Sequence, residues 1–278
     1  MKPAPLEYAR PRTLREAVAL LSDEAANAKV FAGGQSLGPM LNLRLARPGT
    51  LVDIRHVPEL RAVRADSKSC SIGATLTHAE IEDGAIEDFS RGLLRYVARG
   101  IAYRAVRNRG TVGGSLAHAD PAADWVSTMA AIDATIVIRG PTGERRVPAE
   151  QFLVGAFTSE LSATELLAAV ELPRLSAAAR WGYYKICRKT GEFAKSIGVA
   201  IQDSQIGLFR VLAGSTEGRP LLLVRSAEAL ASRGPEYAAR GAREEIEQAL
   251  PHLAAGRRQQ LAVAVQRSLQ QMSLAEAA

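Results

Sequence analysis

The 278-residue chain contains very little cysteine and no long apolar segment. Its two cysteines, Cys70 and Cys187, stand far apart, so they form neither the spacing of a zinc site nor a disulfide framework. They also argue against an iron–sulfur cluster held by this chain, because such a cluster usually needs four thiolates. No stretch approaches the roughly 20 apolar residues of a transmembrane helix. The first residues lack the apolar run of a signal peptide, and we expect a cytoplasmic protein without a transmembrane segment.

Several familiar signatures of binding and catalysis are missing as well. No Gly-x-Gly-x-x-Gly follows a predicted strand, as it would in a Rossmann domain, and no Gly-Lys-Ser/Thr follows a glycine loop, as it would in a P-loop. No Ser-His-Asp set, zinc motif or neighbouring pair of carboxylates stands out. The sequence therefore offers no candidate for a catalytic nucleophile or for a metal site.

Positive charge is in moderate excess. The net charge is +6 and the isoelectric point is about 9.6, values that are also found in nucleic-acid-binding domains. The arginines are scattered, however, and cluster only briefly, as at Arg104, Arg107 and Arg109. We expect no nucleic-acid partner, because a basic surface that meets an acidic partner subunit or an anionic cofactor explains the charge more simply.

The length suits one large or two medium domains, and a hydrophobic fraction of 47% is enough for a real core. Capping boxes at Thr13–Glu16 and Thr77–Glu80 predict two helix starts. Strands are predicted in the first part of the chain at these ranges: 29–32, 51–54, 69–73, 135–139 and 147–152. Around 171–178, Pro173 ends an element and small residues follow, which is typical of a linker. Beyond it, three strands and then two amphipathic helices are predicted: 183–188, 206–212, 221–224, 242–250 and 257–272.

Two glycine-rich segments carry the strongest functional signal. They are Ala32–Ser36 and Thr111–Ser115, each with a glycine pair next to a small hydroxyl residue. Glycine permits positive φ and close approach of another group, and consecutive N–H groups in such a turn can form an anion site. The first segment joins a predicted strand to a helical turn, which would present N–H groups to an anion. Taken alone, a tight structural turn is an equally good interpretation, but two such loops in one domain favour a long ligand with a diphosphate between them.

The second segment is followed by further polar residues. Thr111 and Ser115 offer hydroxyl groups, and Asp124 could accept hydrogen bonds from a ribityl chain or a sugar. Asp124 could equally be a carboxylate that interacts with a helix dipole. A lone histidine such as His118 is more often structural than functional.

At these residues the chain resembles the FAD-binding medium subunit of molybdenum hydroxylases, the family of aerobic carbon monoxide dehydrogenase and xanthine dehydrogenase. The family shows Ala-Gly-Gly-x-Ser followed by Leu-Arg-x-Ala-x-Pro, here 32–36 and 43–48. It also shows Arg-Asn-x-Gly-Thr-Ile/Val-Gly-Gly-Asn/Asp/Ser and then Ala-x-Pro-x-x-Asp, here 107–115 and 119–124. A third motif, Lys-x-x-Arg followed by acidic-aromatic-Ala, matches 185–194. The resemblance covers nearly the whole chain.

The resemblance implies an α+β flavoprotein of two domains. Residues 1–175 would form an FAD-binding domain of the vanillyl-alcohol-oxidase (PCMH) type, in two α+β halves that meet near 55–60. Residues 178–278 would form a C-terminal domain with an antiparallel sheet and helices. The implied cofactor-binding residues are the following: Ala32, Gly33, Gly34, Gln35, Ser36, Leu37, Ile101, Thr111, Gly113, Gly114, Ser115, His118, Asp120, Asp124, Lys185 and Phe193.

The family also assigns roles to some of these positions. Both glycine loops would hold the FAD pyrophosphate, and Asp124 would lie near the polar chain of FAD. Phe193 and Ile101 would flank the isoalloxazine ring, with Lys185 close to it. Ser115 departs from the commoner asparagine or aspartate and has a shorter reach. Gln35 stands where histidine or threonine is common.

The same resemblance implies an electron-transfer role without a catalytic side chain in this chain. A large molybdopterin subunit would oxidise the substrate, and a small subunit would relay electrons through [2Fe–2S] clusters. FAD in this chain would pass them to quinone, NAD or dioxygen, and the complex would be a dimer of heterotrimers. Two other hypotheses stay open: a stand-alone reductase of the same flavin fold, and a scaffold or assembly subunit that has lost FAD. The substrate is not specified, because it would bind to another subunit.

Overall fold

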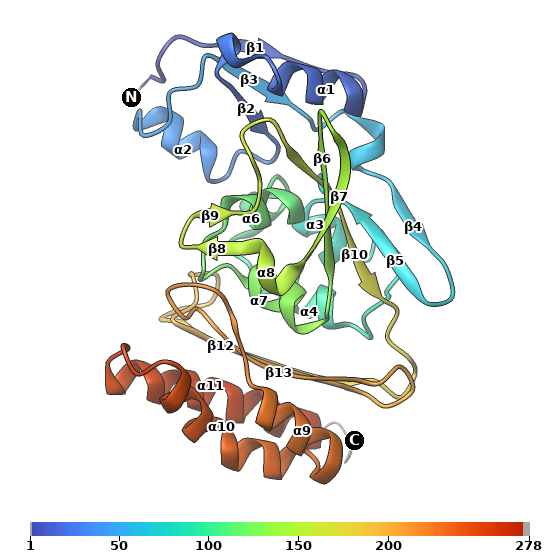
Figure 1. Cartoon of the computed structure of the whole chain (residues 1–278), viewed down its shortest axis with the longest axis vertical. Coiled ribbons are helices and arrows are strands. Elements are labelled where there is room, and N and C mark those ends of the chain that lie inside the picture. Colours follow the sequence, from blue (N-terminus) through green and yellow to red (C-terminus); the bar gives the residue numbers. More distant parts are fainter. Residues whose placement is uncertain (1, 275–278) are drawn as a thin grey trace.

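The computed structural model describes residues 2–274, which form three layers from top to bottom in Figure 1. The strands before the linker are β1 (Glu7–Ala9), β2 (Ala28–Phe31), β3 (Thr50–Asp53), β4 (Val63–Ala65), β5 (Ser69–Gly73), β6 (Thr135–Gly140), β7 (Gly143–Pro148), β8 (Leu153–Gly155), β9 (Thr158–Ser159) and β10 (Leu166–Pro173). The helices there are α1 (Leu14–Leu21), α2 (Leu37–Asn42), α3 (His78–Glu82), α4 (Leu93–Arg99), α5 (Arg104–Arg107), α6 (Val112–His118), α7 (Asp124–Ala131) and α8 (Ala149–Phe152), with 3₁₀ turns η1 (Glu24–Ala26) and η2 (Pro58–Leu60). After the linker come β11 (Arg180–Ile186), β12 (Ser196–Asp203), β13 (Leu208–Gly214), β14 (Leu221–Leu222), α9 (Val224–Arg233), α10 (Pro235–Ala249) and α11 (Ala255–Leu274).

The top layer is a small parallel sheet of order β1-β3-β2. Helix α1 begins as predicted, because Thr13 Oγ1 accepts a hydrogen bond from the Glu16 N–H at 3.2 Å. Ala17 and Leu21 on α1 are buried against Val52 of the sheet. The carboxyl ends of β2 and β3 therefore lie at one edge of this sheet, which is the usual position for a ligand in parallel sheets.

The middle layer is an antiparallel sheet of order β4-β5-β10-β6-β7, with the small hairpin β8-β9 beside it. Side chains of this sheet alternate between its faces. Ile72, Val170 and Ile136 are buried in the core that includes residues of α3, α4, α6 and α7. Helix α7 is buried over its whole length, because the C-terminal sheet covers its other side.

The bottom layer is the antiparallel sheet β11-β12-β13-β14 with the helices α9, α10 and α11 on its outer face. Val199 and Leu212 pack toward the middle layer, whereas Ala200 and Val211 pack toward the helices. The backbone of α11 approaches the sheet closely at Gly182, where an added Cβ would lie 1.8 Å from the Ser268 carbonyl oxygen. Glycine is required there, because any side chain would push the helix off the sheet.

One local prediction was wrong, and two elements were not predicted. Strand β12 was not predicted, because it is buried on both faces and its apolar run shows no alternation. Residues 149–152 form helix α8 and do not continue the sheet, since Pro148 is the last residue of β7 and has no N–H with which to extend the pairing. The region after β14 becomes the additional helix α9, whereas the two closing helices are confirmed as α10 and α11.

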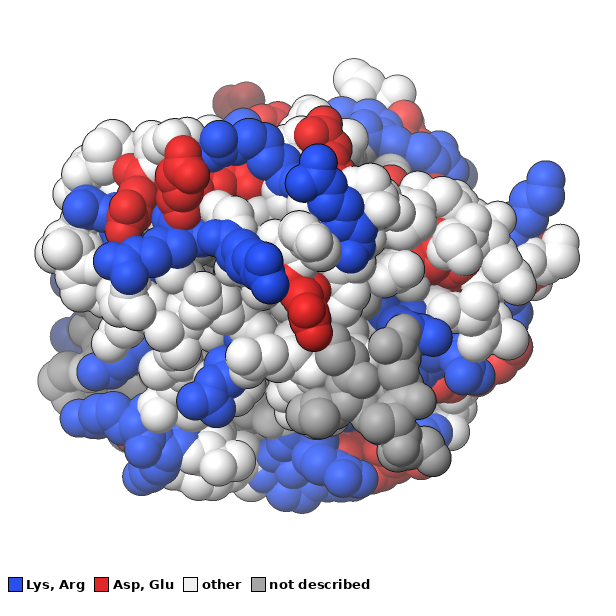
Figure 2. All heavy atoms as spheres, turned by 90° about the horizontal axis from the view of Figure 1, so that it is seen from below, with Lys and Arg blue, Asp and Glu red and all other residues white. Residues whose placement is uncertain are grey.

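No helix within residues 2–274 is both long and apolar enough to cross a membrane. In the same part of the chain, no group of three or more His, Cys, Asp or Glu side chains is placed to hold a metal ion. Figure 2 views the molecule from the side of the C-terminal helices and shows Lys and Arg in separate groups with acidic residues among them. The described residues on this face form no continuous basic stripe of the kind that binds nucleic acid.

Candidate functional site

The first glycine loop connects the end of β2 to the start of α2. The backbone N–H groups of residues 33–37 are not hydrogen-bonded to any part of the chain that the structure describes. Gly34 has a φ of 71°, and the Gln35 side chain turns back to donate from Nε2 to the Gly33 carbonyl at 3.0 Å. Gly33 is buried and residues 34–37 are half-buried or exposed, so donors of this loop can reach an acceptor outside the chain. Consecutive N–H groups of this kind can form an anion site.

The second glycine loop is built differently. Thr111 precedes α6, and its Oγ1 accepts a hydrogen bond from the Gly114 N–H at 3.0 Å. The N–H groups of Val112 and Gly113 donate to the carbonyls of Leu76 and Ala74 at 3.0 and 2.9 Å. The amides at the start of this helix are therefore already bonded. The second loop can contribute close backbone approach and the Ser115 hydroxyl, but few free amide donors.

The two loops are in direct backbone contact. A Cβ added at Gly33 would lie 2.1 Å from the carbonyl oxygen of Arg109 and 2.7 Å from the Cα of Gly110. A Cβ at Gly113 would lie 2.5 Å from the Ala74 side chain. Both positions require glycine, because the neighbouring atoms belong to backbone or to the rigid core. Segments that are far apart in the sequence thus form one continuous surface.

A buried histidine supports the second loop from below. The backbone N–H of His78 donates to the Gly110 carbonyl at 2.9 Å. On the His78 ring, Nδ1 accepts a hydrogen bond from Trp125 Nε1 at 3.0 Å. Burial, with a smaller effect of Arg107, lowers the pKa of His78 to about 4. The ring is therefore neutral and carries its proton on Nε2. His78 lies within the predicted capping box Thr77–Glu80, but no sequence pattern predicts this support, because Trp125 meets it only through the tertiary fold.

Asp124 and Lys185 meet at the junction of the middle and bottom layers. Lys185 Nζ donates to Asp124 Oδ2 at 2.9 Å, and Tyr183 OH donates to Oδ1 at 2.6 Å. Burial raises the pKa of Asp124, and the Lys185 charge and the Tyr183 hydroxyl offset part of this effect. Burial also raises the pKa of Tyr183 well above its ordinary value. The carboxylate thus joins α7 to β11, and Tyr183 is a partner that the sequence analysis did not identify.

Ile101 and Phe193 lie in segments that pair with each other. Ile101 forms a parallel bridge with Gly191, and Lys185 Nζ reaches the Gly100 carbonyl at 3.4 Å. Phe193 follows two residues later and is 65% exposed. The exposed Phe193 ring and the half-buried Ile101 thus come from two neighbouring segments and are free to contact a planar apolar group.

His118 and Asp120 lie at the end of α6. The centroids of the His118 and Phe157 rings are 5.3 Å apart. Burial lowers the pKa of His118. The nearby Asp120 charge opposes this shift, and the Lys29 charge on β2 adds to it. Asp120 Oδ1 accepts a hydrogen bond from the Ala122 N–H at 2.9 Å. Asp120 therefore stabilises the turn that leads into α7.

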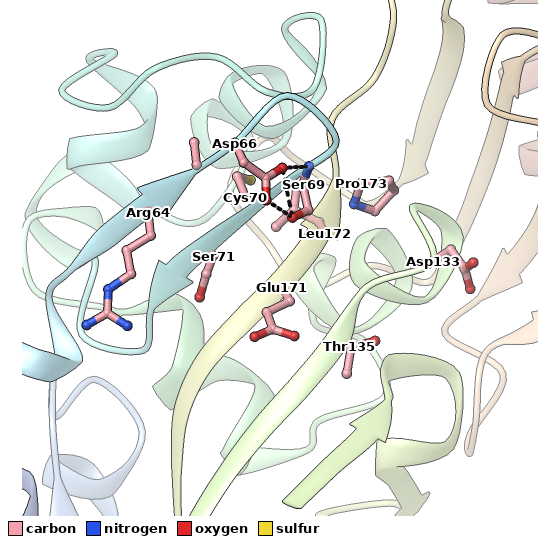
Figure 3. Close-up of a pocket in the computed structure, with 11 residues that line it drawn as sticks. Arg64, Asp66, Ser69, Cys70, Ser71, Asp133, Thr135, Glu171, Leu172 and Pro173 are labelled. Atoms are coloured by element: carbon pink, nitrogen blue, oxygen red, sulfur yellow. Dashed lines mark hydrogen bonds between the residues drawn. The ribbon is translucent and has the colours of Figure 1, made fainter. Parts of the chain in front are cut away.

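A hollow of about 400 Å³ on the middle sheet is separate from these residues (Figure 3). It lies over the row of paired residues Arg64, Ser71, Glu171 and Thr135, on the face opposite the helices. Asp66 at its rim accepts hydrogen bonds from the N–H groups that follow it. None of the predicted cofactor-binding residues lines it.

Several known proteins resemble this chain over most of its length. Residues 4–175 match the family described as "FAD binding domain in molybdopterin dehydrogenase". The carbon monoxide dehydrogenase medium chain of Hydrogenophaga pseudoflava is 39% identical over 194 residues, which are 70% of this chain and 68% of that protein. The caffeine dehydrogenase subunit beta of Pseudomonas sp. (strain CBB1) is 31% identical over 225 residues, 80% and 76% of the two chains. A chain in the structure of quinoline 2-oxidoreductase from Pseudomonas putida 86 superposes with a TM-score of 0.88 at 32% identity, over 99% of each chain.

Proposed function

Since this chain belongs to the FAD-binding domain family of molybdopterin dehydrogenases, we propose that it is the electron-transfer subunit of a molybdenum hydroxylase. In this proposal, electrons reach its FAD from [2Fe–2S] clusters of a small partner subunit and leave to an external acceptor. A large molybdopterin subunit would oxidise the substrate, and the complex would be a cytoplasmic dimer of heterotrimers. The names of the relatives support this proposal, because one is a dehydrogenase medium chain and another is the beta subunit of a dehydrogenase.

The free N–H groups of residues 33–37 are the observation that carries the proposal. Five consecutive donors at the carboxyl end of a parallel sheet suit a diphosphate, whose oxygens accept hydrogen bonds and carry negative charge. A Cβ at Gly33 would collide with the Arg109 carbonyl of the second loop, so glycine at this position keeps the two loops in contact. The residues present therefore fit FAD, the cofactor of this family.

We assign the remaining candidates along the rest of the cofactor. Ser115 would contribute its hydroxyl group at the diphosphate, and Thr111 would support this loop by capping α6. His118 and Asp120 would lie at the edge of this region. Ile101 and Phe193 would flank the flavin ring. Asp124 would hold Lys185 near the ring, and its own charge is balanced by that ammonium at 2.9 Å. When bound, FAD supplies the two-electron chemistry, and the chain supplies binding, orientation and electrostatics.

This assignment divides the chain into two functional domains. We place the FAD-binding domain at 1–175, with halves that meet near 55–60, and the C-terminal domain at 178–278. Separate apolar cores support the division of the first domain, because Val52, Val57 and Leu60 belong to one core and Ile72 to another. The C-terminal domain contributes Lys185 and Phe193, so both domains would be needed for the flavin end of the site.

The first test is the absorbance spectrum of the purified full chain, with the nucleotide identified after denaturation. We expect oxidised-flavin bands and release of FAD at about one per chain. A colourless chain that also fails to bind added FAD would overturn the assignment and favour the scaffold hypothesis.

The electron route is tested by mixing the FAD-loaded chain with reduced partner subunits. Loss of the cluster signal in electron paramagnetic resonance without reduction of the flavin would contradict it.

A further inference from the structure

Four residues at the edge of the parallel sheet form a connected stack beneath the first glycine loop. They are Tyr8 of β1, Phe31 of β2, Asp53 of β3 and Arg55 just after β3. Asp53 is completely buried. None of them belongs to the glycine-rich motifs.

The stack begins at the Asp53 carboxylate. Arg55 binds it through two parallel hydrogen bonds, Nε to Oδ1 at 2.9 Å and Nη2 to Oδ2 at 2.7 Å. Tyr8 OH also donates to Oδ2. Burial would raise the pKa of Asp53, but the hydrogen bonds from Arg55 and Tyr8 outweigh it and lower the pKa to about 2. The guanidinium is thus fixed in place by a two-point ionic contact.

The stack ends at the glycine loop. The Arg55 guanidinium lies over the Phe31 ring, with Cζ 5.3 Å from the ring centroid, which is a cation–π geometry. Two atoms of the Phe31 ring lie only 2.7 Å from the place that a Cβ of Gly34 would occupy. Gly34 has the positive φ that turns the chain at this point. The ring therefore fills the space directly beneath the turn that carries the free N–H groups.

We propose that Arg55 is a positioning residue for the diphosphate loop, holding the Phe31 ring under Gly34 so that the N–H groups of 33–37 are arranged before the cofactor arrives. The inference rests on the proposed function, since it takes this loop as the diphosphate site. The effect would be on the diphosphate end of FAD, because the stack lies at the first loop and makes no hydrogen bond to the residues assigned to the flavin ring. Preorganisation of this kind raises affinity by lowering the cost of ordering the loop.

The test compares Arg55→Met with Arg55→Lys in the full chain after removal of FAD. We expect Arg55→Met to raise the Kd of FAD about three- to tenfold, the scale of a lost cation–π contact. The Kd of ADP, which carries the diphosphate without the flavin, should rise by the same factor. Arg55→Lys should recover part of the loss. The ³¹P resonances of bound FAD should shift, while the flavin absorbance bands should stay in place.

Arg145→Met is the matched control. Arg145 binds Glu165 through a similar pair of hydrogen bonds at 2.7 and 2.8 Å, and it makes no hydrogen bond to residues 33–37. The Arg145→Met variant should leave the Kd of FAD and the Kd of ADP unchanged. If Arg55→Met does not fold, Phe31→Leu removes the ring and keeps the ion pair, and it should give the same loss for FAD and ADP.

The outcomes separate the inference from the proposed function. Wild-type affinity and wild-type ³¹P shifts in both Arg55→Met and Phe31→Leu would overturn the inference alone. An equal loss in Arg145→Met would also overturn it, because the effect would then be general destabilisation. A wild-type chain that binds neither FAD nor ADP would overturn the proposed function and the inference together.

Discussion

Replacing Gly33 by alanine should separate the two glycine loops. The added Cβ would lie 2.1 Å from the Arg109 carbonyl oxygen, whereas ordinary contact begins at 3.4 Å, so the loops must move apart by about 1.3 Å. The neighbouring atoms are backbone and cannot rotate away. Overpacking of this kind costs about 1–3 kcal/mol. A ligand that spans both loops must bring them together again, so the cost should appear as weaker binding of FAD.

The expected rise in the Kd of FAD follows from that cost. At about 1.4 kcal/mol for each factor of ten, the Kd should rise roughly 5- to 150-fold. Any strain that the empty chain retains should instead lower its free energy of unfolding. Titration of the empty chain with FAD, together with urea unfolding without FAD, therefore measures both parts of the same cost.

Gly38→Ala is the internal control for this experiment. Gly38 lies in α2, within five residues of Gly33, and a Cβ there would meet nothing within 4 Å. Alanine is the better helix former by about 1 kcal/mol, so stability should stay equal or rise slightly. The reasoning is refuted if Gly33→Ala keeps both wild-type affinity and wild-type stability, or if Gly38→Ala is equally harmful.

Three further predictions follow from the buried contacts. Because the pKa of His78 is about 4 in the folded chain, against an ordinary value of 6.5, folding stability should fall by about 3 kcal/mol from pH 6.5 to 4. Urea unfolding across this range should show a smaller loss in His78→Gln, and equal losses would exclude the histidine as the cause. Asp124→Asn leaves the Lys185 ammonium without its carboxylate and should cost about 3–5 kcal/mol. Thermal unfolding should show partial recovery in the double variant with Lys185→Met, and no recovery would contradict the pairing. Gly182→Ala should cost about 1–3 kcal/mol by pushing α11 from the sheet, without changing FAD affinity; a wild-type melting temperature would disprove the close packing.

Local sequence patterns predicted a large part of the elements. The capping box at Thr13 fixes the start of α1 through contacts three residues apart, so no distant partner is needed. Strand β12 was not predicted from the sequence. Its side chains are buried on both faces, so its apolar residues do not alternate with polar ones. Its neighbours β11 and β13 and the helices α7 and α11 determine that environment.

The candidate site divides in the same way. The motifs around Gly33 and Gly113 identified the family and the cofactor, because the resemblance depends on residue types at short spacing. The sequence could not show that the amides of the second loop are already bonded to Leu76 and Ala74, while those of the first loop are free. That difference depends on which strand ends lie beside each loop.

By itself, the sequence determined the family, the FAD cofactor and the two loops, since these depend on residue types at short spacing. Only the tertiary structure brought Asp124 to Tyr183 and Lys185 across the layers. It alone placed Arg55 on Phe31 under the first loop. Such contacts join segments far apart in the chain, and their partners are selected by packing and by the need to pair buried charge, which no local pattern records.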